Sequence, residues 1–344
     1  MTDVRRFLSY SAKRAISAFI VLLGVALITF FISHLLSPDP SRLWAGPKAH
    51  ASTIAAVRAR YHLGDPVYLQ LYYFLGDMLT GNFGVDPVSG QSVMSEILFY
   101  LPNTVELVIA AMIIIVVLGV GLGYISAMNF GKLTDSVVRV FYLVTWSTPT
   151  FLGCIGAVLI FATYTHVFPS GGLYSLDLNP PASITGVFVV DSLLALNLPA
   201  FVSGLDHLIL PAATLALLNF GLLARVTRSS VLSVRWATHV KAARAKGIPG
   251  GQVNRRHILR NALIDANTVI AIMFGWLLSG TIVVEEVFAW PGIGQFAYQA
   301  ILNVDYPALI PVVIVFTAGV ILANFVADIV YSVLDPRIAL GGAA

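Results

Sequence analysis

Apolar residues in this chain gather in separated runs, and polar residues gather between the runs. A helix needs about 20 apolar residues to cross the hydrocarbon core of a bilayer. Six runs reach or approach that length, at 15–36, 107–127, within 140–168, 208–224, 266–284 and 308–327. The first is too long for a signal peptide and no small-residue cleavage site follows it. The pattern therefore predicts an all-α, polytopic membrane protein with six transmembrane helices.

The distribution of Lys and Arg predicts the orientation, because these residues favour cytoplasmic connections. Four of them lie in the first 14 residues and nine lie in the connection between the fourth and fifth runs. The connections 165–207 and 285–307 contain none. Both termini are therefore expected in the cytoplasm, and 37–103, 165–207 and 285–307 outside.

These assignments define the expected organisation. A cytoplasmic tail at 1–14 precedes a first transmembrane helix at 15–36 and an extracytoplasmic segment at 37–103. A five-helix core follows at 104–337, with an extracytoplasmic loop at 165–207 and a cytoplasmic loop at 225–265, before a tail at 338–344. Part of the outer loop, 186–204, is apolar enough that entry into the membrane as an interfacial or re-entrant segment stays an alternative.

The segment 37–103 carries signals for short helices. Ser52 or Thr53 is suited to cap a helix that Gly64 ends. Pro66 then opens an amphipathic stretch whose apolar residues have helical spacing. They are Val67, Leu71, Phe74, Leu75 and Met78. In the second run, three alternate glycines, Gly119, Gly121 and Gly123, predict close helix packing.

Composition indicates a protein solvated by lipid, and the common enzyme motifs are missing. Hydrophobic residues make up 58% of the chain and charged residues 11%, against about 25% charged in soluble domains. No phosphate-binding loop, zinc-protease motif or nucleophile-elbow motif is present. Cys154 is the single cysteine, so no internal disulfide and no Cys-rich metal site can form. No catalytic residue and no metal site are expected.

The loop 225–265 contains a distinctive pattern of helix-forming and helix-ending residues. An Ala-rich, basic stretch from Thr238 favours helix, and Gly247 and Pro249 end it. Small side chains permit close docking on a partner, and the charges steer that contact. A nucleic-acid partner is disfavoured because interleaved aromatic residues are absent apart from Trp236.

Several motifs resemble a known family. Ala242-Ala243-x-x-x-Gly247 followed by His257-x-x-Arg-Asn-Ala-Leu263 resembles the EAA loop of permease subunits of ATP-binding-cassette importers, with Lys241 in place of the family's Glu. Further motifs resemble the B-type permeases of dipeptide, oligopeptide and nickel systems. They are Leu101-Pro102-x-Thr104-x-Glu106-Leu107, Arg225 with Arg228, Glu285-x-Val287-Phe288-x-Trp290-Pro291-Gly292-x-Gly294, Asp305-Tyr306-Pro307 and Asp328-x-x-Tyr331-x-x-x-Asp335-Pro336-Arg337.

The resemblance implies a type I importer permease fold in a prokaryotic inner or plasma membrane. It implies a heterodimer with a second, homologous permease, two ATPase subunits or domains and an extracytoplasmic substrate-binding protein. ATP and Mg would bind on the partner subunits, and this chain would hold no cofactor. The residues expected to couple to the ATPase are Lys241, Ala242, Ala243, Arg244, Gly247, Arg255, Arg256 and His257.

Polar residues in or beside the spans are candidates for the translocation pathway, because they are costly in lipid. They are Thr145, Ser147, Thr148, Thr150 and Asn219. Pro149 predicts a helix kink in this stretch, and hydrogen bonding of the hydroxyls to their own helix stays an alternative. The candidates for an outer gate or docking site are Glu106, Glu285, Glu286 and Trp290. For these a structural role, or for Trp290 interfacial anchoring, is the alternative. Asp328 is expected to pair with a basic residue on the cytoplasmic side, such as Arg225 or Arg228, or to cap a neighbouring helix.

The expected function is peptide import, of the dipeptide or oligopeptide class. An oligosaccharide or nickel permease of the same family would share these motifs. A stand-alone secondary transporter would need inverted repeats or buried charges for ion coupling, and an intramembrane enzyme would need paired catalytic residues. The sequence shows neither clearly.

Overall fold

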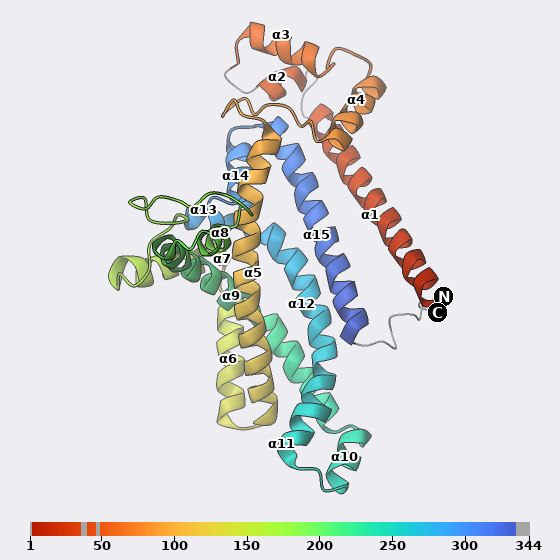
Figure 1. Ribbon diagram of the computed structural model, residues 1–344, viewed down its shortest axis with the longest axis vertical. Coiled ribbons are helices and arrows are strands. Elements are labelled where there is room, and N and C mark those ends of the chain that lie inside the picture. The colour runs from red at the N-terminus through yellow and green to blue at the C-terminus, as the bar shows by residue number, and fades with distance from the viewer. Residues whose placement is uncertain (1, 36–39, 46–48, 335–344) are drawn as a thin grey trace.

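The computed structural model describes residues 2–35, 40–45 and 49–334, and all regular elements in these ranges are helices (Figure 1). A single β-bridge joins Val85 to Ser92. The elements are α1 Thr2–Leu35, α2 Pro40–Ala45, α3 Ala51–Arg60, α4 Val67–Thr80, α5 Val93–Met128, α6 Leu133–Ser147, α7 Thr150–Ala157, η1 Val158–Tyr164, α8 Phe188–Leu194, α9 Leu198–Arg235, α10 Thr238–Ala245, α11 Gly250–Gln252, η2 Val253–Leu259, α12 Arg260–Gly280, α13 Ile282–Val287, α14 Ile293–Leu302 and α15 Tyr306–Leu334.

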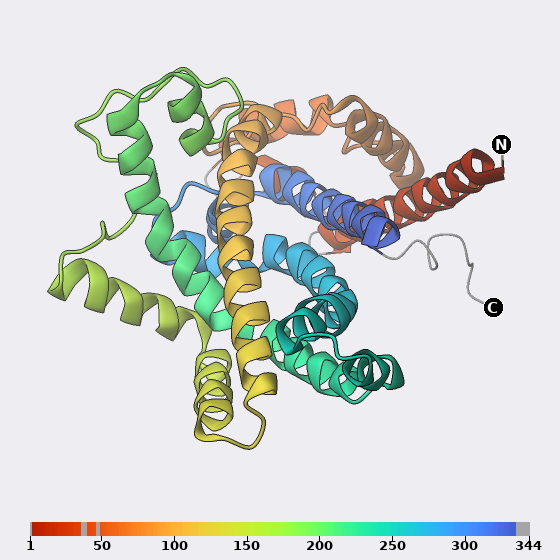
Figure 2. The same ribbon diagram turned by 60° about the horizontal axis from the view of Figure 1, so that its bottom comes forward.

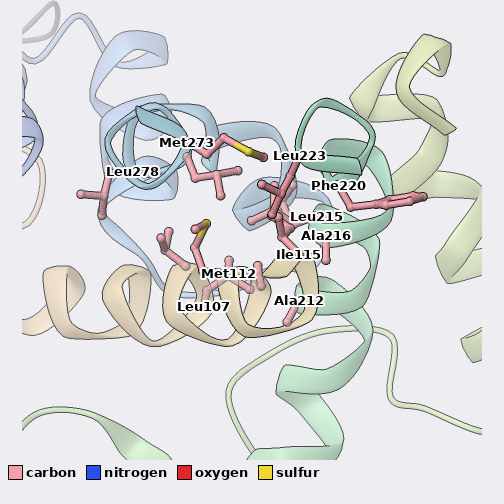
Figure 3. Close-up of a cluster of buried hydrophobic side chains, with 14 of the residues drawn as sticks. Leu107, Met112, Ile115, Ala212, Leu215, Ala216, Phe220, Leu223, Met273 and Leu278 are labelled. Atoms are coloured by element: carbon pink, nitrogen blue, oxygen red, sulfur yellow. The ribbon is translucent and has the colours of Figure 1, made fainter. Parts of the chain in front are cut away.

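The core lies where α5, α9 and α12 meet (Figure 3). Leu107 and Ile115 of α5 face Leu215 and Leu223 of α9, and Met273 reaches them from α12. All five side chains are buried. Each contributes about 1.5–3 kcal/mol if transferred from water. Within a membrane, however, tight packing rather than water exclusion holds such helices together.

Two glycines allow α5 to approach α9 closely. A Cβ added at Gly119 would lie 2.8 Å from the Leu223 side chain, and one at Gly123 would lie 2.6 Å from the carbonyl oxygen of Ala224. A Cβ at Gly121 would meet no atom within 4 Å. The prediction of close packing is therefore confirmed at Gly119 and Gly123, and Gly121 faces open space.

The membrane-spanning helices broadly follow the apolar runs. Among the described residues, four single helices are long and apolar enough to cross a membrane: Arg14–Ile32, Val93–Met128, Leu198–Arg235 and Gly250–Leu278. The bent helix pair discussed below makes up to five. The apolar part of α15 is shorter, Tyr306–Leu322. The full count of six and the cytoplasmic termini stay predictions.

Helix α9 is longer than expected at its start. The prediction placed its beginning near 208 and put the residues before it in an outer loop. The helix begins at Leu198, where the Asn197 side chain accepts a hydrogen bond from the Ala200 N–H. It continues through Pro211. The helix begins before the predicted apolar run because Asn197, which interrupts the apolar stretch 186–204 in the sequence, is an N-cap. The 186–204 stretch therefore consists of α8 and the start of α9. That 165–207 lies outside the membrane stays a prediction.

The third expected span is bent rather than straight. Helix α6 ends at Ser147, and α7 with η1 continues at 103° to it from Thr150. Pro149 caps the second helix, so the predicted kink is confirmed at the predicted place. In Figure 2 the yellow-green α7–η1 pair runs out to the side of the bundle.

The short helices α2 to α4 lie at one end of the molecule and α10 and α11 at the other (Figure 1). Pro66 precedes α4 as predicted, and Gly81 ends it with a φ of 71°. The predicted cap at Ser52 or Thr53 was wrong, since His50 occupies the N-cap of α3 and makes no side-chain capping bond.

Candidate coupling site

Helix α10 is short and sharply bounded. Ala237 has extended backbone before it, and the Lys246 and Gly247 N–H groups close its end on the Ala242 and Arg244 carbonyls. Gly247 has a φ of 76°, the left-handed region that favours glycine. The Ala-rich stretch and its glycine stop therefore form the helix that the sequence predicts.

One face of α10 packs against the bundle. Val240 and Ala243, three residues apart, lie on the same face and are both buried. They join a small cluster that includes Ala127 at the end of α5, Val231 of α9 and Ile258 of η2. Helix α10 thus packs against η2 and shares one apolar cluster with the ends of α5 and α9.

The opposite face of α10 is open and basic. The expected coupling residues that are exposed are Lys241, Ala242, Arg244, Gly247, Arg255 and Arg256. No Asp or Glu occurs between 207 and 264, so no acidic residue of this stretch balances these charges. Ala243, expected on the contact surface, instead faces inward because it shares the Val240 face, and His257 is half-buried.

A buried ion pair fixes the helices that carry this loop. The Arg228 guanidinium of α9 donates from Nε to one oxygen of Asp135, at 2.8 Å, and from an Nη to the other, at 2.9 Å. Ser126 of α5 and the Gly131 N–H also donate to this carboxylate. Such bidentate pairs fix orientation as well as distance. The α5–α6 turn is thereby tied to α9 a few residues before α10.

Asp135 was missed by the sequence reasoning, which considered only Asp328 as the partner of Arg228. A signal was available, since Asp135 is an isolated acid beside an expected span and such a group needs a partner. Arg225, the other expected partner, lies over the Trp146 ring at 5.3 Å. The side chain of Asp328 falls outside the described residues, so its pairing stays a prediction.

A second polar contact reaches the next helix. The Ser230 hydroxyl of α9 donates to Asp265 of α12 at 2.6 Å. Together with the Arg228 pair, it links α5, α6, α9 and α12 near the end that carries α10. These four helices are therefore connected to one another by polar contacts close to α10.

The candidate pathway residues are spread around the bend and on α9. The hydroxyls of Thr145 and Thr148 donate to carbonyls of their own helix. Asn219 does the same, donating to the Leu215 carbonyl at 2.7 Å. Ser147 is exposed and Thr150 half-buried at the bend. Thr145, Thr148 and Asn219 therefore bond to carbonyls of their own helices, which was the alternative to a pathway role for the hydroxyls. A role of the five candidates in a pathway stays a prediction.

The outer candidates are largely interior. Glu285 is fully buried and accepts hydrogen bonds from the Thr104 hydroxyl at 2.8 Å and the Gln295 N–H at 2.9 Å. Trp290 is also fully buried and donates from Nε1 to the Asn103 carbonyl at 2.9 Å. These bonds join α5 to α13 and to the segment that follows it, and they join α13 to α14. Trp290 therefore packs inside the protein and does not anchor in the interface.

The two remaining acidic candidates also lie against the protein. Glu106 is buried and accepts a hydrogen bond from the Val189 N–H at 2.9 Å, which holds α8 against α5. Glu286 is half-buried, with one carboxylate oxygen that has no partner. In this conformation neither Glu106 nor Glu285 is presented to a protein docking from solvent.

Comparison with known proteins agrees with this architecture. Residues 119–340 match the family described as binding-protein-dependent transport system inner membrane component, and 6–108 match the N-terminal region of such membrane components. The chain therefore belongs to this family and is a multi-pass inner membrane component of an ATP-binding-cassette transport system.

Curated relatives match over almost their whole length. The probable D,D-dipeptide transport system permease protein DdpB of Escherichia coli is 36% identical, over 98% of this chain and 99% of the relative. The di/tripeptide transport system permease protein DppB of Pseudomonas aeruginosa is 35% identical, over 96% and 98%. The glutathione transport system permease protein GsiC of Salmonella choleraesuis is 33% identical, over 96% and 99%. A chain of the MetNI methionine ABC transporter has a TM-score of 0.49 at 16% identity, over 68% of this chain and 93% of that one.

Proposed function

We propose that this chain is a permease subunit of an ATP-driven importer of short peptides. It would form the translocation pathway with a second permease and receive substrate from an extracytoplasmic binding protein. The relatives named above transport D,D-dipeptides, di- and tripeptides and glutathione by their names. Glutathione is itself a tripeptide, so the substrates that these names share are short peptides.

The exposed face of α10 is the proposed contact with an ATPase subunit, and this is the observation that carries the proposal. The face is basic, contains small side chains and has no acidic residue near it in sequence. An ATPase surface with acidic groups would be complementary to it. ATP and Mg would bind on that subunit, and this chain would supply the contact and the mechanical link.

Coupling then follows from the packing. A change in the ATPase dimer would shift α10, and the Val240–Ala243 face would pass that shift to the ends of α5 and α9. The Arg228–Asp135 pair would make α6 follow α9. Such rigid linkages let a small movement at one site select between two packings of a helix bundle.

The second permease is proposed to cover part of the bent α6–α7–η1 region. Large apolar side chains are exposed along all three elements. Examples are Val140, Val144, Phe151, Leu152, Ile160 and Phe161. Lipid would cover the remainder, since the family is membrane-embedded.

Charge reversal on α10 tests the proposed coupling. The intact complex, with its binding protein, is reconstituted in liposomes, and ATP hydrolysis and uptake of a labelled dipeptide are measured. Arg244→Glu is expected to lower uptake by at least about tenfold, because like-charge contact at an interface costs several kcal/mol. Lys132→Glu, an exposed change of the same charge on the α5–α6 turn, is the control and should retain uptake.

Two outcomes would overturn the assignment. Full uptake by Arg244→Glu would exclude α10 as an energetically important contact. Loss in both variants to the same extent would indicate a general effect of charge.

Uptake that needs an ion gradient but no ATP would instead favour the secondary-transporter alternative. Competition by oligosaccharide or nickel rather than peptide would change the substrate class.

A further inference from the structure

Three carboxylic acids are buried together at the end of the molecule that carries α2 to α4. Asp86, Glu96 and Asp305 have exposed fractions of 4%, 9% and 2%. They come from the turn before α5, the first turn of α5 and the residue before α15. The carboxyl groups of Asp86 and Asp305 lie close enough for each to shift the pKa of the other. Segments far apart in sequence therefore bring three acidic side chains to one place, beside the apolar cluster that packs the start of α5 against α15.

No cation balances this cluster within the described parts of the chain. No ion pair between described side chains involves these three acids, and no group of described residues is arranged to hold a metal ion. Besides one another, the titratable group that faces them is the Tyr100 phenol of α5. One carboxylate oxygen of Glu96 is buried without any hydrogen-bond partner. Full ionisation would therefore place three uncompensated charges in the interior.

A hydrogen bond between the carboxyl groups of Asp86 and Asp305 requires a proton, because two ionised carboxylates have no donor between them. Burial, the hydrogen bond to Asp86 and the nearby Glu96 raise the pKa of Asp305 to about 8. Burial alone would raise the pKa of Asp86, but hydrogen bonds from Asp305, Val88 and Ser89 outweigh it and lower that pKa. The pair therefore retains one proton at a higher pH than an ordinary carboxyl group would. Asp305 also accepts a hydrogen bond from the Ala308 N–H at the start of α15.

We propose that Asp86, Asp305 and Glu96 form a proton-binding site that fastens the 84–92 turn to the start of α15. The turn is closed by the Val93 N–H bond to the Gly84 carbonyl, and its Asp86 N–H bonds to the Gln91 carbonyl. Loss of the proton leaves two carboxylates in contact, and they repel each other. The turn then separates from α15, and its backbone amides become accessible to water.

The sign of the pH effect follows from the direction of the shift. A carboxyl group whose pKa is higher in the closed state binds more protons in that state. Closure is therefore favoured at low pH and weakens as the pH rises from the ordinary Asp pKa through the raised one. The lowered pKa of Asp86 adds no dependence above neutrality. The site would sense the external pH if 37–103 and 285–307 lie outside the cytoplasm, as predicted from the distribution of Lys and Arg. The pH dependence of the closure does not depend on that orientation.

Hydrogen exchange of the 84–93 backbone amides, in the assembled complex, tests the site. Wild type is compared with Asp305→Asn at the same pH, so the intrinsic exchange rate cancels. The Asn side chain can still accept from Ala308 and donates to Asp86 without a titratable proton. The exchange rate of wild type divided by that of the variant is expected to be near one at pH 5.5 and at least about ten at pH 9. Each unit of pKa shift corresponds to a factor of ten in the closing equilibrium.

Asp77→Asn is the control, because Asp77 lies on the neighbouring α4 and its carboxylate accepts a hydrogen bond from the Asn82 side chain. It should exchange like wild type at both pH values. Asp86→Asn replaces the test variant if Asp305→Asn does not assemble, and it should also suppress the pH dependence. A wild-type to variant ratio that stays constant from pH 5.5 to 9 overturns the proposal. So does a pH dependence that the Asn variants retain.

Discussion

Replacing Asp135 with Asn removes the carboxylate that holds Arg228. Asp135 has a side-chain exposed fraction of 2% and Arg228 of 17%. The Asn amide can accept through one oxygen, while its NH₂ group opposes the guanidinium donors. Breaking a buried pair by removing one partner costs about 3–5 kcal/mol. Because Arg228 retains some exposure, the lower end of that range, about 3 kcal/mol, is expected for the free energy of unfolding.

Arg139 supplies the matched control. It also lies near Asp135, with 3.6 Å between Arg139 Nε and the carboxylate, but its side chain is 46% exposed. An exposed ion pair contributes about 0–1 kcal/mol. Arg139→Gln therefore removes a charge next to the same carboxylate at little cost. The comparison separates loss of the buried bidentate contact from loss of a nearby charge.

The assay is denaturant unfolding of the purified chain in mixed micelles, followed by the fluorescence of its tryptophans. The double variant Asp135→Leu, Arg228→Met should recover most of the lost stability, since paired apolar replacements of buried ion pairs are often neutral. An Asp135→Asn variant within about 1 kcal/mol of Arg139→Gln would refute the reasoning. A double variant no more stable than the Asn variant would show that the cost is not an orphaned charge.

Two further stability predictions follow from the packing and hydrogen bonds. Gly123→Ala should destabilise by about 1–3 kcal/mol because its Cβ would meet a backbone carbonyl of α9, whereas Gly121→Ala, with nothing within 4 Å, should not. Equal unfolding midpoints for these two would refute the close approach. Trp290→Phe should cost about 1–3 kcal/mol by leaving the Asn103 carbonyl without its donor. Trp236→Phe, at an exposed site, should stay within about 0.5 kcal/mol, and a similar loss in both would contradict the assigned hydrogen bond.

The apolar runs predicted the spans because a bilayer imposes one length on every crossing helix. Helix α10 was predictable as well, since its Ala-rich stretch and Gly247 are local signals. Continuous helices through Pro102 and Pro211 were harder, because neighbouring helices can satisfy the backbone groups that proline frees.

The polar contacts were largely beyond prediction from sequence. Asp135 and Arg228 are 93 residues apart, and nothing local specifies which acid a buried guanidinium meets. The same holds for Glu285 and Thr104, and for Asp86 and Asp305. Charge and position indicated that Glu285 and Trp290 matter, but only the packing shows that they bond within the protein.

The most direct test of the central claim is affinity purification of the chain from native membranes in mild detergent, with co-purifying chains identified by mass. The account predicts a second permease and ATP-hydrolysing subunits, with a substrate-binding protein as an added partner. Recovery of the chain alone, or only with copies of itself, under conditions that preserve other membrane complexes would contradict it.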